Sequence, residues 1–100
     1  MGDTNYIGSV VKILEKPNQT VINGKTLRTD FRVQLVDVRN IQIAYLVFWG
    51  NLGEDITNNY QLNDYMMVEG YLSFPKNTKN KLVKQSLTKA QITVLKVYSI

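Results

Sequence analysis

The stretch LVFWGNLGEDITNNY, residues 46–60, holds the change of pattern that decides the fold. It opens with four bulky apolar residues that end at Trp49 and run into a glycine, as at the buried end of a strand. Beyond the glycine, Leu52, Ile56 and Tyr60 recur every four positions, which is the spacing of one apolar stripe on a short helix. We therefore predict a strand that ends at Trp49 and a helix that follows it directly.

Most of the remaining chain alternates with a period of two, which is typical of strands with one wet face. The pair Asn23-Gly24 supplies the two positive-φ positions of a tight hairpin turn. Gly70, inside an apolar run, indicates a bulge or a sharp corner. The expected strands are residues 6–14, 27–38, 41–49, 65–74, 82–87 and 90–97, with a hairpin at 21–27, a helix at 50–60 and a polar loop at 75–81.

This order of elements is that of the OB fold. We predict an all-β protein with a five-stranded Greek-key antiparallel barrel and one short helix between strands 3 and 4. The apolar stripe of the helix would plug the open end of the barrel. Leu46 and Phe48 should point into the barrel, whereas Val47 and Trp49 should point outward. A length of 100 residues fits a single OB-fold domain over residues 1–100.

The composition excludes several kinds of site. The chain has no cysteine and no histidine, so it lacks disulfides, thiolate zinc ligands and the commonest general base. The carboxylates show no paired spacing for acid–base work, and no phosphate-cradling glycine loop or nucleophile motif occurs. No signal-peptide pattern and no membrane-spanning apolar run is present. We expect a protein that is not an enzyme, needs no cofactor or metal and does not insert into a membrane.

Positive charge is concentrated near the C-terminus. Residues 1–74 hold six Lys or Arg and eight Asp or Glu, whereas residues 75–100 hold six lysines and no acid. A one-sided basic segment of this kind attracts a polyanion, but it also serves as a solubilising hairpin. Lysine outnumbers arginine nine to three, a bias that also follows from an AT-rich genome. Charge alone leaves both interpretations open.

Five segments, taken in order, resemble the bacterial single-stranded DNA-binding protein (SSB) superfamily, including its short PriB-type primosomal relatives. They are NYI at 5–7, VINGKTLRTDFRVQLVD at 21–37, LVFWGNLGEDITNNY at 46–60, DYMMVEGYLSF at 64–74 and KNKLVKQSLTKAQITVLK at 79–96. The resemblance implies an OB barrel that binds single-stranded DNA in DNA replication or at a primosome. It is to a small tail-less protein of the kind found in cyanobacteria and plastids, and it implies the plastid stroma or the bacterial cytoplasm as the location.

The chain departs from that family at its stacking aromatics. Family SSBs carry stacking tryptophans on a long loop between strands 2 and 3, early in strand 3 and beyond strand 4. Here the loop at 38–40 is short, and the other two positions fall at Ile43 and Asn77. Trp49 stands where the family commonly has Phe, and we expect a protein without the acidic tail of the family, since the sequence reaches Ile100 on a predicted strand. The resemblance is therefore to a minimal SSB rather than to an ordinary replicative one.

An OB barrel binds single strands over strands 2 and 3, where aromatic rings stack on bases and Lys or Arg contacts phosphates. The candidate nucleic-acid-binding residues share outward positions on these strands, on strand 4 or in the basic segment beyond it. They are Arg28, Arg32, Tyr45, Trp49, Tyr71, Phe74, Lys76, Lys79, Lys81 and Lys84. Ile43 and Val47 are expected to lie on the same outward face. The first hypothesis is a module that binds single-stranded DNA, or RNA, without sequence specificity.

Each of these residues also has a structural interpretation. Trp49 packs well in any half-buried position, and strand tyrosines often face another subunit. The alternative hypothesis is an OB-fold protein-interaction subunit of a larger assembly, replicative or otherwise, that does not bind nucleic acid. Exposed strand edges favour self-association, so we expect a homodimer or homotetramer that forms through residues 7–11 or through Met67, Glu69 and Tyr71.

Overall fold

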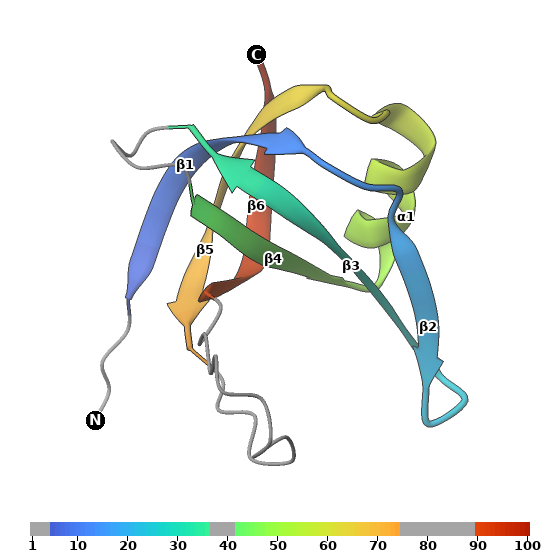
Figure 1. Cartoon of the computed structure of the whole chain (residues 1–100). Helices are drawn as coiled ribbons and strands as arrows, with labels where there is room; N and C mark the ends of the chain where they lie inside the picture. Colours follow the sequence, from blue (N-terminus) through green and yellow to red (C-terminus); the bar gives the residue numbers. More distant parts are fainter. Residues whose placement is uncertain (1–4, 37–41, 75–89) are drawn as a thin grey trace, which may run out of the picture.

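The structure of the protein is a computed structural model, and it describes residues 5–36, 42–74 and 90–100. The described elements are strands and one helix (Figure 1). They are β1 (Tyr6–Ile13), β2 (Asn18–Ile22), β3 (Thr26–Leu35), β4 (Gln42–Trp49), α1 (Asn51–Asn59), β5 (Tyr65–Ser73) and β6 (Ala90–Ser99). The predicted turn at 37–40, loop at 75–81 and strand at 82–87 lie outside the described residues.

Five of these strands close into a barrel. β1 pairs with β5 along most of its length and with β3 at its C-terminal end, and β6 and β4 complete the circuit between β5 and β3. β2 extends the sheet beyond β3 and makes the sixth strand. α1 follows β4 and precedes β5, so the predicted OB fold is confirmed. One described pair, β4 with β6, is parallel, which the alternation along each strand does not reveal.

The hairpin between β2 and β3 turns where the sequence predicts it. Asn23 has φ 54° and Gly24 has φ 67°, the left-handed conformation that a two-residue hairpin turn requires. The Lys25 N–H donates to the carbonyl oxygen of Ile22 at 3.1 Å and closes the turn. The register of β3, and with it the side chains that β3 turns outward, is therefore set close to this turn.

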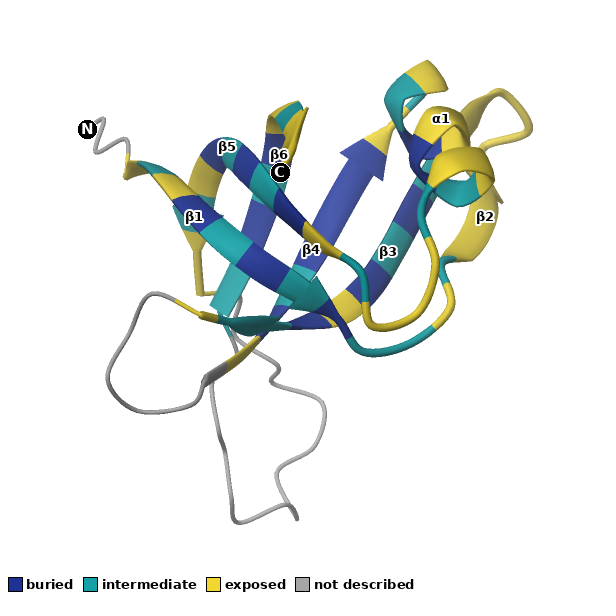
Figure 2. Ribbon diagram, turned by 90° about the horizontal axis from the view of Figure 1, so that it is seen from above, coloured by how far each residue is buried: buried dark blue, intermediate teal, exposed yellow. Residues whose placement is uncertain are grey.

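Apolar side chains from alternate strand positions fill the barrel, and Figure 2 shows the buried positions as dark blue bands that recur along the strands. The rings of Phe31 and Phe48 stack with their centroids 5.5 Å apart. Leu46 and Phe48 both lie in this core, as predicted. Complete burial of such side chains contributes about 1.5–3 kcal/mol each. The core residues are Val11, Ile13, Phe31, Val33, Ala44, Leu46, Phe48, Ile56, Met66, Val68, Ile92 and Val94.

The helix α1 covers one end of the barrel beside β3 and β4 (Figures 1 and 2). Ile56 is buried in the core, and Leu52 and Tyr60 pack against it, so the predicted plug is confirmed. Gly50, the residue between β4 and α1, has φ 71°, where a side chain would be strained. This conformation turns the chain from the apolar end of β4 straight into the helix.

Two further glycines allow close approaches between elements. A Cβ on Gly53 of α1 would overlap the side chain of Thr29 in β3. A Cβ on Gly70 of β5 would overlap the carbonyl oxygen of Thr93 in β6, and the β5–β6 register shifts between Glu69 and Gly70. The bulge or corner predicted from Gly70 is therefore confirmed.

Candidate nucleic-acid interface

The outward side chains of β3 and β4 form the surface that we call the β3–β4 face. The two strands are antiparallel neighbours, so directly opposed residues turn side chains to the same side of the sheet. Arg28 is opposite Trp49, and Arg32 is opposite Tyr45. The face consists of Arg28, Asp30, Arg32 and Gln34 from β3 and Ile43, Tyr45, Val47 and Trp49 from β4. Four predicted site residues are therefore brought together.

Trp49 is the most prominent aromatic residue of the face. It lies at the end of β4 and is 43% exposed. The Cζ atom of Arg28 lies over the indole at 5.8 Å from the ring centroid, within the range of a cation–π interaction. One side of the ring is thus occupied by the guanidinium, and the exposed remainder can accept one stacked base.

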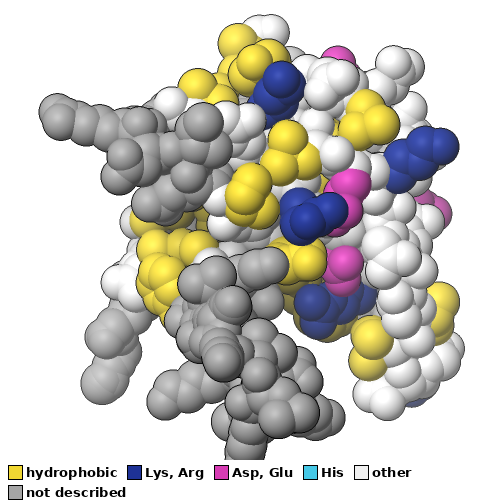
Figure 3. Space-filling view, in the orientation of Figure 1, with side chains coloured by type: hydrophobic (Ala, Val, Ile, Leu, Met, Phe, Trp, Pro, Cys, Tyr) yellow, Lys and Arg dark blue, Asp and Glu magenta, His cyan; other side chains and the backbone are white. Residues whose placement is uncertain are grey.

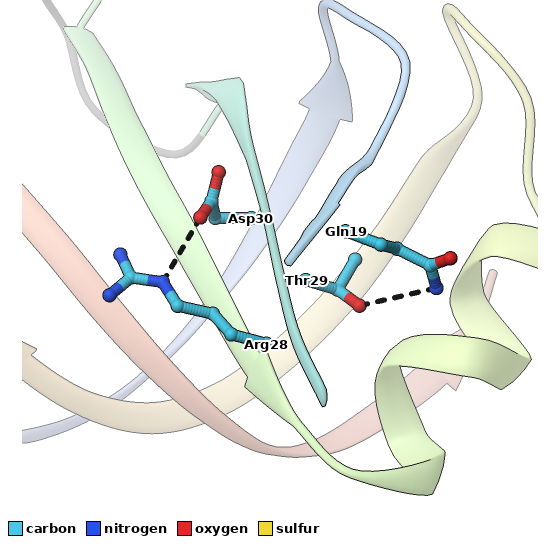
Figure 4. A network of polar contacts seen from close by, with 4 residues as sticks. All are labelled: Gln19, Arg28, Thr29 and Asp30. Atoms are coloured by element: carbon cyan, nitrogen blue, oxygen red, sulfur yellow. Dashed lines mark hydrogen bonds and ion pairs between the residues drawn. The ribbon is translucent and has the colours of Figure 1, made fainter. Parts of the chain in front are cut away.

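Each arginine of the face is paired with a carboxylate. The Nε atom of Arg28 lies 3.0 Å from Oδ2 of Asp30, two residues along the same strand (Figure 4). The Nη2 atom of Arg32 lies 3.0 Å from Oε1 of Glu15, whose other oxygen accepts the backbone N–H of Arg32 at 2.8 Å. The side-chain hydrogen bond from Arg32 lowers the pKa of Glu15, and it raises the pKa of Arg32.

Val47 does not belong to the accessible part of the face, which corrects the expectation that it would line the binding surface. It is only 1% exposed, although it lies outside the core cluster. β4 runs between β3 and β6, where Asp30 and Thr93 are the register partners of Val47, so side chains from both neighbours can cover this small residue. Trp49 is consequently separated by a buried position from Tyr45 and Ile43.

Tyr71 lies elsewhere on the barrel than Trp49. It belongs to β5, which is separated from β4 by β6, so it lies about 10 Å around the sheet from Val47. Its ring contacts the ring of Tyr6 edge to face, with centroids 5.3 Å apart. The structure therefore does not place Tyr71 beside the exposed indole.

Tyr71 belongs to a group of three tyrosines near the carboxylate of Glu69. Sequence reasoning missed this group. The hydroxyls of Tyr6 and Tyr98 donate to Oε1 of Glu69 at 3.0 and 3.4 Å. The hydrogen bond to Glu69 and partial desolvation raise the pKa of Tyr6. We call Tyr6, Glu69, Tyr71 and Tyr98 the tyrosine cluster. Their outward positions could be predicted from the sequence, but the register that brings the neighbouring strands β1, β5 and β6 together could not.

The remaining predicted site residues follow β5. Phe74 is exposed and comes directly after Ser73, whose register partner Gln91 is also the partner of Tyr45 in β4. Phe74 is thus closer in the sheet order to the Tyr45 end of the β3–β4 face than to Trp49. The four predicted lysines, Lys76, Lys79, Lys81 and Lys84, lie outside the described residues.

Neither a metal site nor a membrane span is found in the described part of the chain. Within residues 5–36, 42–74 and 90–100, no three Asp, Glu, His or Cys side chains are grouped so as to hold a metal ion. The single described helix, α1, is too short and too polar to cross a membrane.

Comparison with known proteins gives one sequence match and several matches of fold. No family model matches the chain. The chain is 38% identical over 73 residues to the "Putative single-stranded DNA-binding protein ycf41" of Trieres chinensis, a match that covers 69% of this chain and 65% of that protein. The chain thus spans just under two thirds of the length of this relative.

Three solved structures share the architecture over nearly the whole chain. The SSB domain of a protein from Synechococcus sp. has a TM-score of 0.74 at 19% identity, covering 98% of both chains. The second SSB (SSBb) of Mycobacterium smegmatis has a TM-score of 0.76 at 18% identity, and the match covers 97% of this chain and 89% of that chain. The small SSB of Streptomyces coelicolor has a TM-score of 0.79 at 14% identity, and the match covers 100% of this chain and 96% of that chain.

The closed barrel, its plugging helix and these structural neighbours define an OB-fold protein. The sequence match adds one relative to this fold class. The chain is an OB-fold protein that is similar in sequence to the Trieres chinensis relative and similar in fold to the three SSB structures.

Proposed function

We propose that this protein binds single-stranded DNA without sequence specificity through the β3–β4 face. The observation that carries the proposal is the half-exposed Trp49 at the edge of a face that also holds Tyr45 and two arginines. Aromatic rings of this kind stack on any base, at about 1–3 kcal/mol for each base. The names of the sequence relative and of the structural neighbours, which describe single-stranded DNA-binding proteins, support the same ligand.

In the proposed mechanism, stacking and charge act on different parts of the strand. One base stacks on Trp49 and another on Tyr45, and Phe74 can extend this aromatic row beyond the end of β5. Arg28 and Arg32 contact the phosphates between these bases, since each guanidinium lies opposite one of the two rings. Lys76, Lys79, Lys81 and Lys84 add a basic segment that captures the backbone electrostatically. The same chemistry would accept single-stranded RNA.

We further propose a PriB-like role, in which residues 1–100 act as one OB domain at a primosome or in DNA replication. The support is the ordered set of segments that resembles the short primosomal relatives. The plastid stroma or a bacterial cytoplasm is the proposed location, on the same resemblance. The proposed activity is binding rather than catalysis.

Self-association is proposed through β1 and the tyrosine cluster. β1 pairs with β3 only over Val11–Ile13, so Tyr6–Gly8 has a described strand partner on the β5 side alone. Tyr6 and Tyr71 next to this edge are each more than 40% exposed. An open strand edge beside exposed aromatics suits a second copy of the chain. Light scattering tests this proposal. A mass of 11.5 kDa at high protein concentration is the mass of a monomer and would contradict self-association.

A second candidate function is a protein-interaction subunit that does not bind nucleic acid. The observations that favour it are the burial of Val47 in the centre of the β3–β4 face and the exposed tyrosine cluster on the neighbouring strands β1, β5 and β6. Under this hypothesis the β3–β4 face contacts a protein partner instead of nucleic acid. Co-purification with one stoichiometric protein partner and without nucleic acid would support it.

A fluorescence titration separates the two functions. Trp49 is the only tryptophan, so its emission reports on the β3–β4 face alone. Single-stranded oligo-dT should quench this emission, and the apparent affinity should fall steeply as salt is raised. Unchanged emission at low salt with micromolar oligo-dT, and no complex in filter binding, would exclude the nucleic-acid function.

A further inference from the structure

The β3–β4 face combines a stacking platform with a net charge of zero among its described ion-paired groups. Arg28 is matched by Asp30, and Arg32 is matched by Glu15. Figure 3 shows the same mixture over one side of the molecule, with Asp and Glu side chains beside Lys and Arg and with hydrophobic side chains between them. A surface that only collected phosphates would not need these two acids.

The Arg28–Asp30 pair is partly withdrawn from solvent. The side chains are 35% and 21% exposed, so the pair is screened less than one on an open surface. The carboxylate of Asp30 contacts the Nε atom of Arg28. Figure 4 shows the two terminal nitrogens of Arg28 pointing away from this carboxylate. Arg28 can therefore reach a phosphate while the pair remains intact, but that phosphate then also meets the negative charge of Asp30.

Glu15 restrains Arg32 more completely. Its two oxygens bind the backbone N–H and the guanidinium of Arg32, so this carboxylate is fixed rather than free to swing away. It comes from the segment after β1, outside the two strands of the face. A phosphate at Arg32 must compete with this acid for the same guanidinium.

We propose that Asp30 and Glu15 are affinity-limiting residues of the nucleic-acid site: they cancel the charge of Arg28 and Arg32, so that the β3–β4 face holds a strand by stacking and only weakly by its phosphates. This inference rests on the proposed function and adds the regulation of its affinity. If the carboxylate partner of either arginine is neutralised, that arginine should become a full phosphate contact.

The size of the effect follows from counterion release. One additional phosphate contact to a single strand steepens the dependence of log affinity on log salt by about 0.7. Between 200 and 50 mM salt this corresponds to about a 2.5-fold extra gain in affinity for each released arginine. The Asp30→Asn and Glu15→Gln variants should each show this gain, and the double variant should show both.

The first experiment needs no nucleic acid. Iodide, an anion, and acrylamide, which is neutral, both quench the emission of Trp49, and their ratio reports the local potential. Asp30→Asn should increase iodide quenching and leave acrylamide quenching nearly unchanged. Asp55→Asn is the matched control, because it makes the same change of charge on α1 at an exposed residue without a described ion pair.

The second experiment measures the affinity for fluorescein-labelled oligo-dT at 50 and 200 mM salt. Asp30→Asn should bind more tightly and with the steeper slope, and the Arg28→Gln/Asp30→Asn double variant should lose that gain. Binding by the wild type with no gain, or with a loss, in Asp30→Asn would overturn the inference but leave the proposed function standing. Absence of binding by every variant at 50 mM salt would overturn both.

Discussion

Replacement of Trp49 by alanine should weaken the binding of single strands by about 5- to 30-fold. One side of the indole is covered by Arg28, so the ring offers room for one base, and 43% of the residue is exposed. Loss of one stacked base costs about 1–3 kcal/mol, and because part of the ring is covered we expect about 1–2 kcal/mol. A factor of ten in affinity corresponds to about 1.4 kcal/mol, which gives the expected range.

The assay is fluorescence anisotropy of labelled oligo-dT, since the variant has no tryptophan of its own. Trp49→Phe keeps an aromatic ring and should recover most of the affinity. Tyr65→Ala is the matched control, because Tyr65 is also an exposed aromatic, at 49%, but lies on β5 opposite Lys12 of β1. Circular dichroism establishes that each variant is folded. An affinity of Trp49→Ala within twofold of the wild type would refute the stacking role.

Three further predictions concern the fold, the pH dependence and the separation of the two surfaces. Gly53→Ala should lower the free energy of unfolding by about 1–2 kcal/mol in urea denaturation, because overlap with Thr29 costs about 1–3 kcal/mol and the helix propensity of Ala recovers up to about 1 kcal/mol; equal or higher stability would contradict the close approach. The pKa of Glu15 is lowered in the folded protein by Arg32, so its stabilising contribution is present above the ordinary value of 4.5 and is lost as the pH falls through the lowered pKa. The wild type should therefore be more stable than Glu15→Gln at pH 7 in thermal denaturation, with a difference that shrinks in acid; a difference that grows in acid would be the wrong sign. Tyr71→Ala should leave the affinity for oligo-dT nearly unchanged while it weakens self-association in sedimentation velocity, and the opposite pattern would place nucleic acid at the tyrosine cluster.

The sequence predicts those parts of the molecule that depend on neighbours along the chain. The Asn23-Gly24 turn, the alternation in β3 and the glycine at the bulge each act locally, so their positions could be predicted and are confirmed. The helix was also predictable, because its apolar stripe follows the end of β4 without a break. The pairing of Arg28 with Asp30 was open to the same reasoning, since residues two apart in a strand share a face, but it was not anticipated.

What the sequence does not reveal depends on register between distant strands. Val47 occupies an outward position, yet it is buried because β4 lies between two neighbours rather than at an edge. Glu15 reaches Arg32 only because the segment after β1 runs beside β3. Tyr71 shares the outer surface with the β3–β4 face but meets Tyr6, because β6 is inserted between β4 and β5.

The central claim is that a single strand binds the β3–β4 face, and NMR mapping of the backbone amides during titration with oligo-dT tests it most directly. We expect the largest shift changes at Arg28, Arg32, Tyr45 and Trp49, with small changes in the tyrosine cluster. Shift changes confined to the tyrosine cluster, or none at saturating oligo-dT and low salt, would contradict the account.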